Sequence, residues 1–330
     1  MNKLIVLMMN LEVLTNEILN GYRITKEEAM LLVELPLNEV TFQANRIRKH
    51  FCSDNFDACT IINVKSGKCI EDCKFCAQSI HYPTKIKEYP LLTREKLIEQ
   101  TQKIYDYGLK RISYVASGRT ITQNEFQTIK ESIIQLKNEN KDIKICVSLG
   151  LLTENQIKTL EKIGVDRIHN NIETSKKYFQ NVCTTHSYNE KIETLEKISN
   201  KNIKICSGGI FGLGEDYEDR IDQALELRKY NVMSIPINIL HPIPGTPLEN
   251  NKILTNDEVC RIIAIYRFIN PKAYIRLAGG RLQLSDNGKK ALQSGANAAI
   301  LGNMLTTRGV EIKEDMMMLK ELGYNIIYDI

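Results

Sequence analysis

Three cysteines lie close together in the run Gly67-Lys-Cys-Ile-Glu-Asp-Cys-Lys-Phe-Cys-Ala-Gln-Ser79. Their spacing, Cys69-x3-Cys73-x2-Cys76, supplies three thiolates on one short segment. An ordinary electron-transfer 4Fe-4S cluster takes four cysteines, and a structural zinc ion takes four ligands. The spacing therefore predicts a 4Fe-4S cluster in which one iron has no protein ligand and can bind a small molecule directly.

Zinc is the alternative occupant of these cysteines, with His81 as a fourth ligand. Structural zinc sites usually pair two short Cys-x2-Cys segments, and the sequence contains one such pair, Cys73 and Cys76. The cluster is therefore the favoured interpretation.

A glycine-rich run follows later, Ser207-Gly-Gly-Ile-Phe-Gly-Leu-Gly-Glu215. Such a run permits close backbone approach by a flat ligand, although alone it is more often a tight turn. Together with the cysteine spacing it resembles the radical S-adenosylmethionine superfamily, where the open iron binds the amino and carboxylate groups of that cofactor. The resemblance implies that Gly208, Ile210 and Gly212 contact its adenine. Phe75 would pack on the adenine too, or else belong to the core.

Short apolar runs alternate with amphipathic stretches from residue 58 onward, which is typical of repeated βα units. Eight such units predict a TIM-type (β/α)8 barrel, an α/β fold whose active site lies at the C-terminal ends of the strands. The expected strands are 58–64, 112–116, 143–149, 167–172, 204–208, 234–240, 273–277 and 298–301. The expected helices are 94–107, 123–138, 153–163, 188–198, 217–229 and 257–268.

Residues 1–50 form a predicted N-terminal helical extension, with Thr25 and Glu28 as a capping box, and residues 51–330 form the barrel domain. We expect the extension to cover the outside or one end of the barrel. No linker-like tract divides the chain.

Composition narrows the possible partners and compartment. The formal net charge is +4, with lysine and glutamate interleaved, so no basic block indicates nucleic acid. The apolar run 4–9 is too short to span a bilayer, so we expect no membrane partner. Nine cysteines, an odd number, favour a reducing compartment over a disulfide framework and predict a cytoplasmic protein.

Cys59, Cys146 and Cys206 fall on the first, third and fifth expected strands, and Arg276 falls on the seventh. Alternate strands of such a barrel contribute to the same interior layer, so these four side chains should converge near its axis. Three thiolates and a guanidinium suit a second, anionic iron-sulfur cluster. The alternative is a packed core of buried thiols with Arg276 paired to an acid. Cys52 and Cys183 are weaker candidate ligands, and Cys260 is expected to be an inert core residue.

The motifs taken together resemble the biotin synthase family. Those that carry the resemblance are Gly67–Ser79, His169-Asn-Asn-Ile-Glu-Thr-Ser175, Cys206–Glu215, Pro236-Ile-Asn-Ile-Leu240, Gly245-Thr-Pro247 and Ile275-Arg-Leu-Ala-Gly-Gly-Arg281.

The resemblance implies a reaction and a set of roles. A radical made from S-adenosylmethionine removes hydrogen from dethiobiotin, and sulfur is inserted from an auxiliary cluster, so the enzyme is a sulfurtransferase that makes biotin. Asn171 and Glu173 would contact the cofactor's ribose, and Asn171 and Asn238 the ureido ring of dethiobiotin. Cys146, Cys206 and Arg276 would bind the auxiliary cluster. A flavodoxin- or ferredoxin-like electron donor and a homodimer are also implied.

The sequence departs from the family pattern on the second strand, where the best-described members carry a cluster cysteine and this chain has Ser113. Our hypothesis is that Cys59 takes over ligation, which leaves open whether the auxiliary cluster is 2Fe-2S or a variant. His169, Phe75 and Glu173 also differ from the residues usual in the family.

Two other classes remain as alternatives at this point. One is another barrel-type radical enzyme, similar to hydrogenase maturases or to methylornithine synthase, which should not need interior thiolates. The other is an iron-sulfur carrier or redox sensor without turnover.

Overall fold

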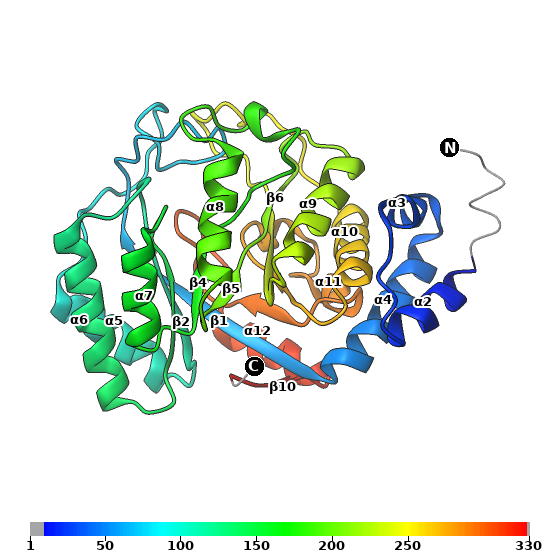
Figure 1. The fold of residues 1–330 in the computed structure, drawn as a ribbon, viewed down its shortest axis with the longest axis horizontal. Coiled ribbons are helices and arrows are strands. Elements are labelled where there is room, and N and C mark those ends of the chain that lie inside the picture. Colours follow the sequence, from blue (N-terminus) through cyan, green and yellow to red (C-terminus); the bar gives the residue numbers. More distant parts are fainter. Residues whose placement is uncertain (1–9, 329–330) are drawn as a thin grey trace.

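A closed barrel of parallel strands forms the centre of the computed structural model, which describes residues 10–328 (Figure 1). Eight strands of that part of the chain complete the barrel, because the first strand pairs with the last. They are β1 (Asn55–Lys65), β2 (Arg111–Ala116), β3 (Lys144–Ser148), β4 (Arg167–His169), β5 (Lys204–Cys206), β7 (Ser234–Ile239), β8 (Tyr274–Leu277) and β9 (Ala298–Ile300). The predicted TIM-type fold and its eight strands are confirmed.

Helices follow the strands and surround the barrel (Figure 1). They are α5 (Arg94–Asp106), α6 (Gln123–Glu139), α7 (Glu154–Lys162), α8 (Tyr188–Ser199), α9 (Tyr217–Lys229), α10 (Asn256–Ile269), α11 (Lys289–Gln293) and α12 (Ile312–Glu321). The six helices expected between residues 94 and 268 are all present.

Hydroxyl and carboxyl side chains fix where these helices begin. Thr122, Thr153, Ser187, Asp216 and Thr255 each accept a hydrogen bond from the backbone three residues on, within a complete capping box. Such boxes satisfy the free N–H groups of a helix start. The loops that leave the C-terminal ends of the barrel strands therefore enter the following helices at defined positions.

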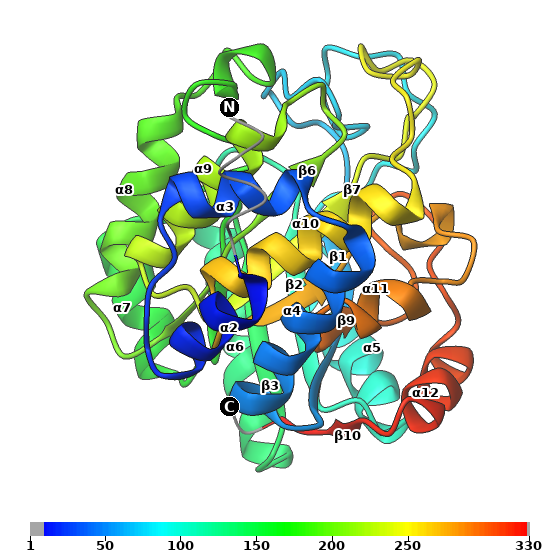
Figure 2. The same cartoon turned by 90° about the vertical axis from the view of Figure 1, so that its right-hand side faces the viewer.

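Three N-terminal helices, α2 (Leu11–Leu19), α3 (Lys26–Glu34) and α4 (Leu37–Cys52), cover the outside of the barrel against α9 and α10 (Figure 2). Lys26 ties α3 to α9 through ion pairs of 2.9 Å with Glu218 and 2.7 Å with Asp222. The capping box of Thr25 and Glu28 is confirmed. The division at residue 50 stays a prediction, and the run 4–9 lies outside the described residues.

Two short strands, β6 (Gly209–Phe211) and β10 (Asn325–Ile326), and the helices α11 and α12 were not expected from the sequence. The strand β6 extends the line of β5 along β7, and β10 pairs with the start of β1. Strands of two or three residues carry too little periodicity to be recognised. Within residues 10–328, no helix combines the length and apolar character needed to cross a membrane.

Candidate active site

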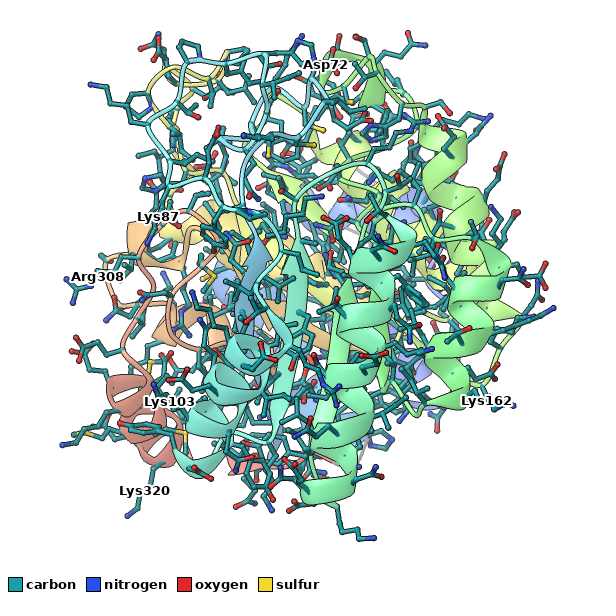
Figure 3. All side chains as sticks on the ribbon, turned by 90° about the vertical axis from the view of Figure 1, so that its left-hand side faces the viewer. Asp72, Lys87, Lys103, Lys162, Arg308 and Lys320 are labelled. Carbon is teal, nitrogen blue, oxygen red and sulfur yellow. The ribbon has the colours of Figure 1, made fainter. Side chains whose placement is uncertain are left out.

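The loop that follows β1 carries Cys69, Cys73 and Cys76 at the end of the barrel where catalytic loops gather. Figure 3 shows Asp72, next to Cys73, at the opposite end of the molecule from Lys320 of α12. Backbone bonds from Cys69 N to Gln78 O (3.0 Å) and from Ile80 N to Cys69 O (2.8 Å) fold the loop back on itself. All three cysteines line one cavity of about 190 Å³.

Three half-buried thiols with no further cysteine in this cavity fit a cluster that has one open iron. Burial raises the pKa of Cys76 to about 11 and also raises the pKa of Cys69, so ligand binding must displace their protons. His81 is exposed, and its Nε2 contacts Ile70 O at 3.0 Å. In the described part of the chain, His81 belongs to no set of three donor atoms within 4.8 Å of one another. The zinc alternative therefore gains no support from the geometry.

A second cavity of about 350 Å³ lies inside the barrel, and Cys59 of β1, Cys146 of β3, Cys206 of β5 and Arg276 of β8 all line it. The predicted convergence of these four side chains is therefore present. Their sulfur atoms are not a set within 4.8 Å of one another, so the spacing is wider than one ion needs. The donor set fits a polynuclear group.

A buried charge network lies beside the interior cysteines. Asp57 of β1 pairs with Arg111 of β2 (Nε to Oδ1, 2.8 Å), Arg167 of β4 and Arg276, and none of the four residues is more than 2% exposed. Arg111 also points Nη1 at Cys146 Sγ, 3.9 Å away. Three guanidinium groups and one carboxylate leave a net charge of 3 − 1 = +2. Uncompensated buried charge is costly, so this layer favours an anionic occupant.

The interior thiols do not supply that negative charge while they hold their protons. Burial raises the pKa of Cys59 to about 12, although the neighbouring Arg276 opposes the shift, and burial also raises the pKa of Cys146. Coordination to iron would convert these thiols to thiolates and would balance the excess positive charge.

Arg276 is already engaged by the protein. Besides its ion pair with Asp57, its Nη1 donates to Asp57 O (3.0 Å) and Ala299 O (2.9 Å), and its Nε donates to Ser234 Oγ (3.3 Å). This is the acid pairing that the packed-core alternative describes. A ligand role for Arg276 stays a prediction.

The other interior contacts concern Cys206, Ser113 and Cys52. Cys206 Sγ lies 3.3 Å from His169 Nδ1 and 3.3 Å from Ser234 Oγ. Ser113 of β2 lines the interior cavity and pairs in register with Cys146 of β3. At the position of the cluster cysteine that this chain lacks, a hydroxyl therefore points into the cavity. Cys52 lies outside both cavities against Arg267 (3.6 Å).

Phe75, Asn171 and Glu173 line both cavities and form the wall between them. Phe75 packs in a small apolar cluster with Ile210 and Leu240, which is a suitable surface for a flat ring. Glu173 has a φ of 64°, a left-handed conformation that non-glycine residues rarely adopt and that clusters at functional sites.

The predicted polar contacts are partly occupied by backbone groups. Asn171 Oδ1 accepts from Gly208 N (3.0 Å) and its Nδ2 donates to Glu173 Oε2 (3.3 Å), and Asn238 accepts from Gly279 N (3.0 Å) and donates to Gly209 O (3.0 Å). Each amide retains one more donor and one more lone pair. Asn171 and Asn238 both line the interior cavity, so these groups can still serve a substrate.

The two glycines of the predicted adenine motif line neither cavity. A Cβ at Gly208 would lie 2.0 Å from Pro236 O, so the packing of β7 already requires glycine there. Gly212 has a φ of 99° and donates its N–H to Glu215. Ile210, between them, does line the interior cavity.

Sequence reasoning missed Asp57, Arg111 and Arg167. The available signal was a charged residue at the start of three apolar strand runs, one position before the expected strand for Asp57 and Arg111 and at its first position for Arg167. Such a residue must find a partner when it is buried.

Comparisons with known proteins agree with this architecture. The Radical SAM superfamily profile matches residues 63–227, and the Biotin and Thiamin Synthesis associated domain matches residues 236–325. The solved structure of methylornithine synthase matches with a TM-score of 0.82 at 19% identity, and the match covers 96% of this chain and 97% of the methylornithine synthase chain. A maturase of the [FeFe]-hydrogenase has a TM-score of 0.81 at 18% identity, covering 97% and 76%. At these identities the likeness shows the fold alone, and with the superfamily match it defines a radical S-adenosylmethionine protein.

Curated relatives give the family. The chain is 52% identical over 317 residues to biotin synthase of Brachyspira hyodysenteriae, covering 96% of this chain and 95% of the relative. It is 50% identical over 310 residues to biotin synthase of Clostridium botulinum, covering 94% and 97%. The chain belongs to the biotin synthase family, and the resemblance drawn from its motifs is confirmed. The methylornithine-synthase-like and maturase-like alternatives are not favoured.

Proposed function

We propose that the protein inserts sulfur into dethiobiotin to give biotin, and that it is a sulfurtransferase with two cysteine-bound clusters. The observation that carries the proposal is the pair of cavities with a common wall, one lined by Cys69, Cys73 and Cys76 and the other by Cys59, Cys146 and Cys206. An enzyme that both generates a radical and donates sulfur needs two such sites in reach of one substrate.

The loop cysteines hold the 4Fe-4S cluster and leave one iron for S-adenosylmethionine. Bound there and reduced, this cluster would supply the electron that cleaves the cofactor to a 5'-deoxyadenosyl radical. The chain's own contribution is placement. Phe75 and Ile210 offer an apolar surface to the adenine, and Asn171 and Glu173 reach the ribose from the shared wall.

The interior cysteines hold the auxiliary cluster, which is the sulfur source. Cys59 replaces the ligand that Ser113 cannot provide, since both residues line the same cavity. Arg111, Arg167 and Arg276 make this layer positive and thereby favour bound thiolates and sulfide.

Dethiobiotin binds between the two cysteine sets. Its ureido ring offers N–H donors and a carbonyl acceptor, and the remaining donors and lone pairs of Asn171 and Asn238 complement both. The target carbons have no acidic proton, so no general base is needed and their position relative to the radical decides the outcome.

An external flavodoxin- or ferredoxin-like donor reduces the loop cluster, and the enzyme works as a homodimer in the reducing cytoplasm. The electron donor and the homodimer rest on the family resemblance, and the cytoplasmic location rests on the nine cysteines.

The experiment is a single-turnover assay with protein whose clusters are rebuilt anaerobically with isotopically heavy sulfide. Biotin made in buffer without added sulfide should carry the heavy label by mass spectrometry. A Cys146→Ser variant should still cleave S-adenosylmethionine but form no labelled biotin. Unlabelled biotin from fully labelled protein would contradict the proposal.

A further inference from the structure

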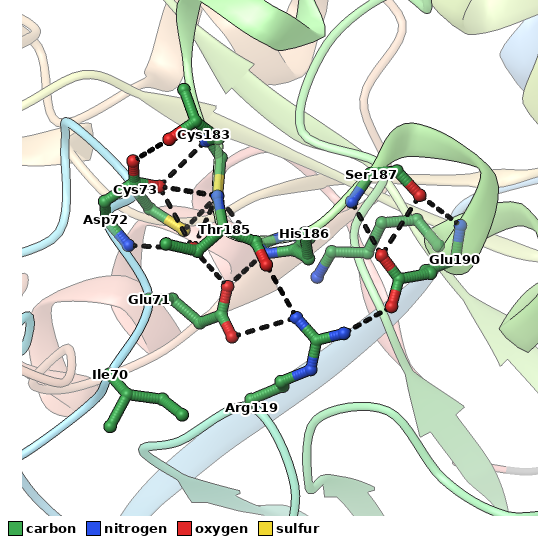
Figure 4. Close-up of polar contacts among 12 residues, drawn as sticks. Ile70, Glu71, Asp72, Cys73, Arg119, Cys183, Thr185, His186, Ser187 and Glu190 are labelled. Atoms are coloured by element: carbon green, nitrogen blue, oxygen red, sulfur yellow. Dashed lines mark hydrogen bonds and ion pairs between the residues drawn. The ribbon is translucent and has the colours of Figure 1, made fainter.

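Cys183, a weaker candidate ligand in the sequence that lines neither cavity, lies with His186 against the cysteine loop, on the segment between the turn Phe179–Asn181 and α8 (Figure 4). Cys183 Sγ is 3.7 Å from Cys73 Sγ and 3.1 Å from His186 Nδ1. The three donor atoms lie within 4.8 Å of one another, and no other three metal-ligating groups in residues 10–328 do so. Cys183 is 3% exposed and His186 is 8% exposed.

We propose that Cys73, Cys183 and His186 bind one thiophilic divalent cation, such as Zn²⁺ or Co²⁺, when the loop carries no cluster. In a tetrahedral zinc site with Zn–S bonds of about 2.3 Å, two sulfur ligands lie about 3.8 Å apart. The observed separation of 3.7 Å between the two sulfurs already has this value. A sulfur and an imidazole nitrogen on the same ion lie about 3.6 Å apart, so the 3.1 Å contact must open slightly.

Two carboxylates hold the site together. Asp72 Oδ1 accepts from Thr184 N (2.8 Å) and Thr185 N (3.1 Å) and lies 3.1 Å from Cys183 Sγ. Glu71 accepts from Arg119 (3.2 Å) and contacts His186 Nδ1 (Figure 4). The segment that carries Cys183 is thereby fixed to the cysteine loop. Neither carboxylate lies within 4.8 Å of all three donor atoms, so the site offers an ion three protein ligands and leaves the fourth position of a tetrahedral shell to water.

His186 presents Nδ1 to Cys183 and also contacts Glu71 through the same nitrogen. An ion bound at Nδ1 would displace Glu71 from it and leave the ring proton on Nε2, which is buried and has no hydrogen-bond partner among the described residues. Cys73 and His186 both line the 190 Å³ cavity, which gives an ion a path to the site. Thiolate and imidazole donors together select Zn²⁺, Co²⁺ or Fe²⁺ over Mg²⁺ and Ca²⁺.

The proposal does not depend on the reaction that the protein catalyses. If Cys73 is also a ligand of the loop cluster, as the proposed function holds, the ion and that cluster exclude each other. A zinc ion bound here would then block rebuilding of the cluster.

The test is an anaerobic Co²⁺ titration of the full-length, cluster-free chain, with a thiol-free reductant to prevent a disulfide. The background variant is Cys69→Ser/Cys76→Ser, which retains Cys73, and it is compared with the same variant carrying Cys183→Ser. The interior cysteines are common to both, so their contribution cancels. Cys260→Ser in the same background is the matched control, because Cys260 is a buried cysteine of α10.

We expect the background and the Cys260→Ser variant to show thiolate-to-cobalt charge transfer and the visible bands of tetrahedral Co²⁺. Cys183→Ser should weaken this binding ~100-fold or more, because one of the ligands is lost. Equal titrations with and without Cys183 would overturn the proposal. If circular dichroism shows that Cys183→Ser misfolds, the same cobalt titration is made with His186→Gln, and the same loss of binding is expected.

A second readout addresses the shared cysteine. Wild-type protein preloaded with one equivalent of Zn²⁺ should rebuild its loop cluster from iron and sulfide more slowly than metal-free protein, and Cys183→Ser should remove the delay. If the rate of cluster rebuilding is unchanged while cobalt binding is intact, Cys73 is not shared between the ion and the cluster. This result would not bear on whether the protein forms biotin.

Discussion

Asp57 should be among the residues on which the stability of the barrel depends most. In Asp57→Asn the side chain keeps its shape, but Arg111, Arg167 and Arg276 lose their carboxylate partner. Removing one partner of a buried ion pair typically costs about 3–5 kcal/mol, because an uncompensated charge remains. We therefore expect a loss of about 4 kcal/mol in the free energy of unfolding.

Urea denaturation of the cluster-free protein, followed by circular dichroism, measures this effect. With an m-value of about 3 kcal/mol/M, the midpoint should fall by about 1 M at unchanged slope. Asp142→Asn is the control, because that carboxylate is 49% exposed in its ion pair with Lys110 and its removal should leave the midpoint nearly unchanged. If the two variants had equal midpoints, the three guanidinium groups would not depend on Asp57, and the description of an electropositive buried layer would be wrong.

Three further predictions concern packing, substrate and pH. Gly208→Ala forces a Cβ against Pro236 O and should lower the free energy of unfolding by about 3 kcal/mol in denaturant titrations. Ser207→Ala is the control: it removes a buried hydroxyl without a partner and should be nearly neutral. Asn238→Ala should raise the KM for dethiobiotin about tenfold in steady-state assays, the effect of one lost hydrogen bond, while S-adenosylmethionine binding stays unchanged. Burial raises the pKa of Glu125, but its hydrogen bonds with Lys65 and Thr122 outweigh that effect and lower it. Its contribution to stability should therefore be complete above pH ~4.3 and lost as the pH falls below that value, so wild type and Glu125→Gln converge in acid.

The barrel could be predicted because its information is local. Each strand is a short apolar run, each helix has its own amphipathic pattern, and most helices begin at a capping residue visible in the sequence. Parallel strands joined by helices close in sequence order, so eight units were enough to give the topology. The strand β10 was not predicted because its Asn325 pairs with Asn55, which is far away along the chain.

The candidate site could be predicted where a motif or strand parity placed it. Cys59, Cys146 and Cys206 converge because odd-numbered barrel strands share a layer. Arg111 and Arg167 could not be assigned, since their partner Asp57 is 54 and 110 residues away along the chain. For the same reason the contact between Cys183 and Cys73, 110 residues apart, could not be foreseen. At Gly208 the contact with a ligand stays a prediction, and the close packing against β7 that the structure shows there depends on a neighbour the sequence could not identify.

Anaerobic Mössbauer spectroscopy on iron-reconstituted protein tests the central claim, which is that the interior cysteines hold a second cluster. The comparison is between wild type, Cys59→Ser and the triple variant Cys69→Ala/Cys73→Ala/Cys76→Ala, with biotin formation assayed alongside. We predict that the triple variant keeps one cluster signal, that Cys59→Ser removes that same signal from the wild type, and that neither variant forms biotin. A triple variant without any cluster would contradict the account, because the interior cavity would then hold no sulfur to transfer.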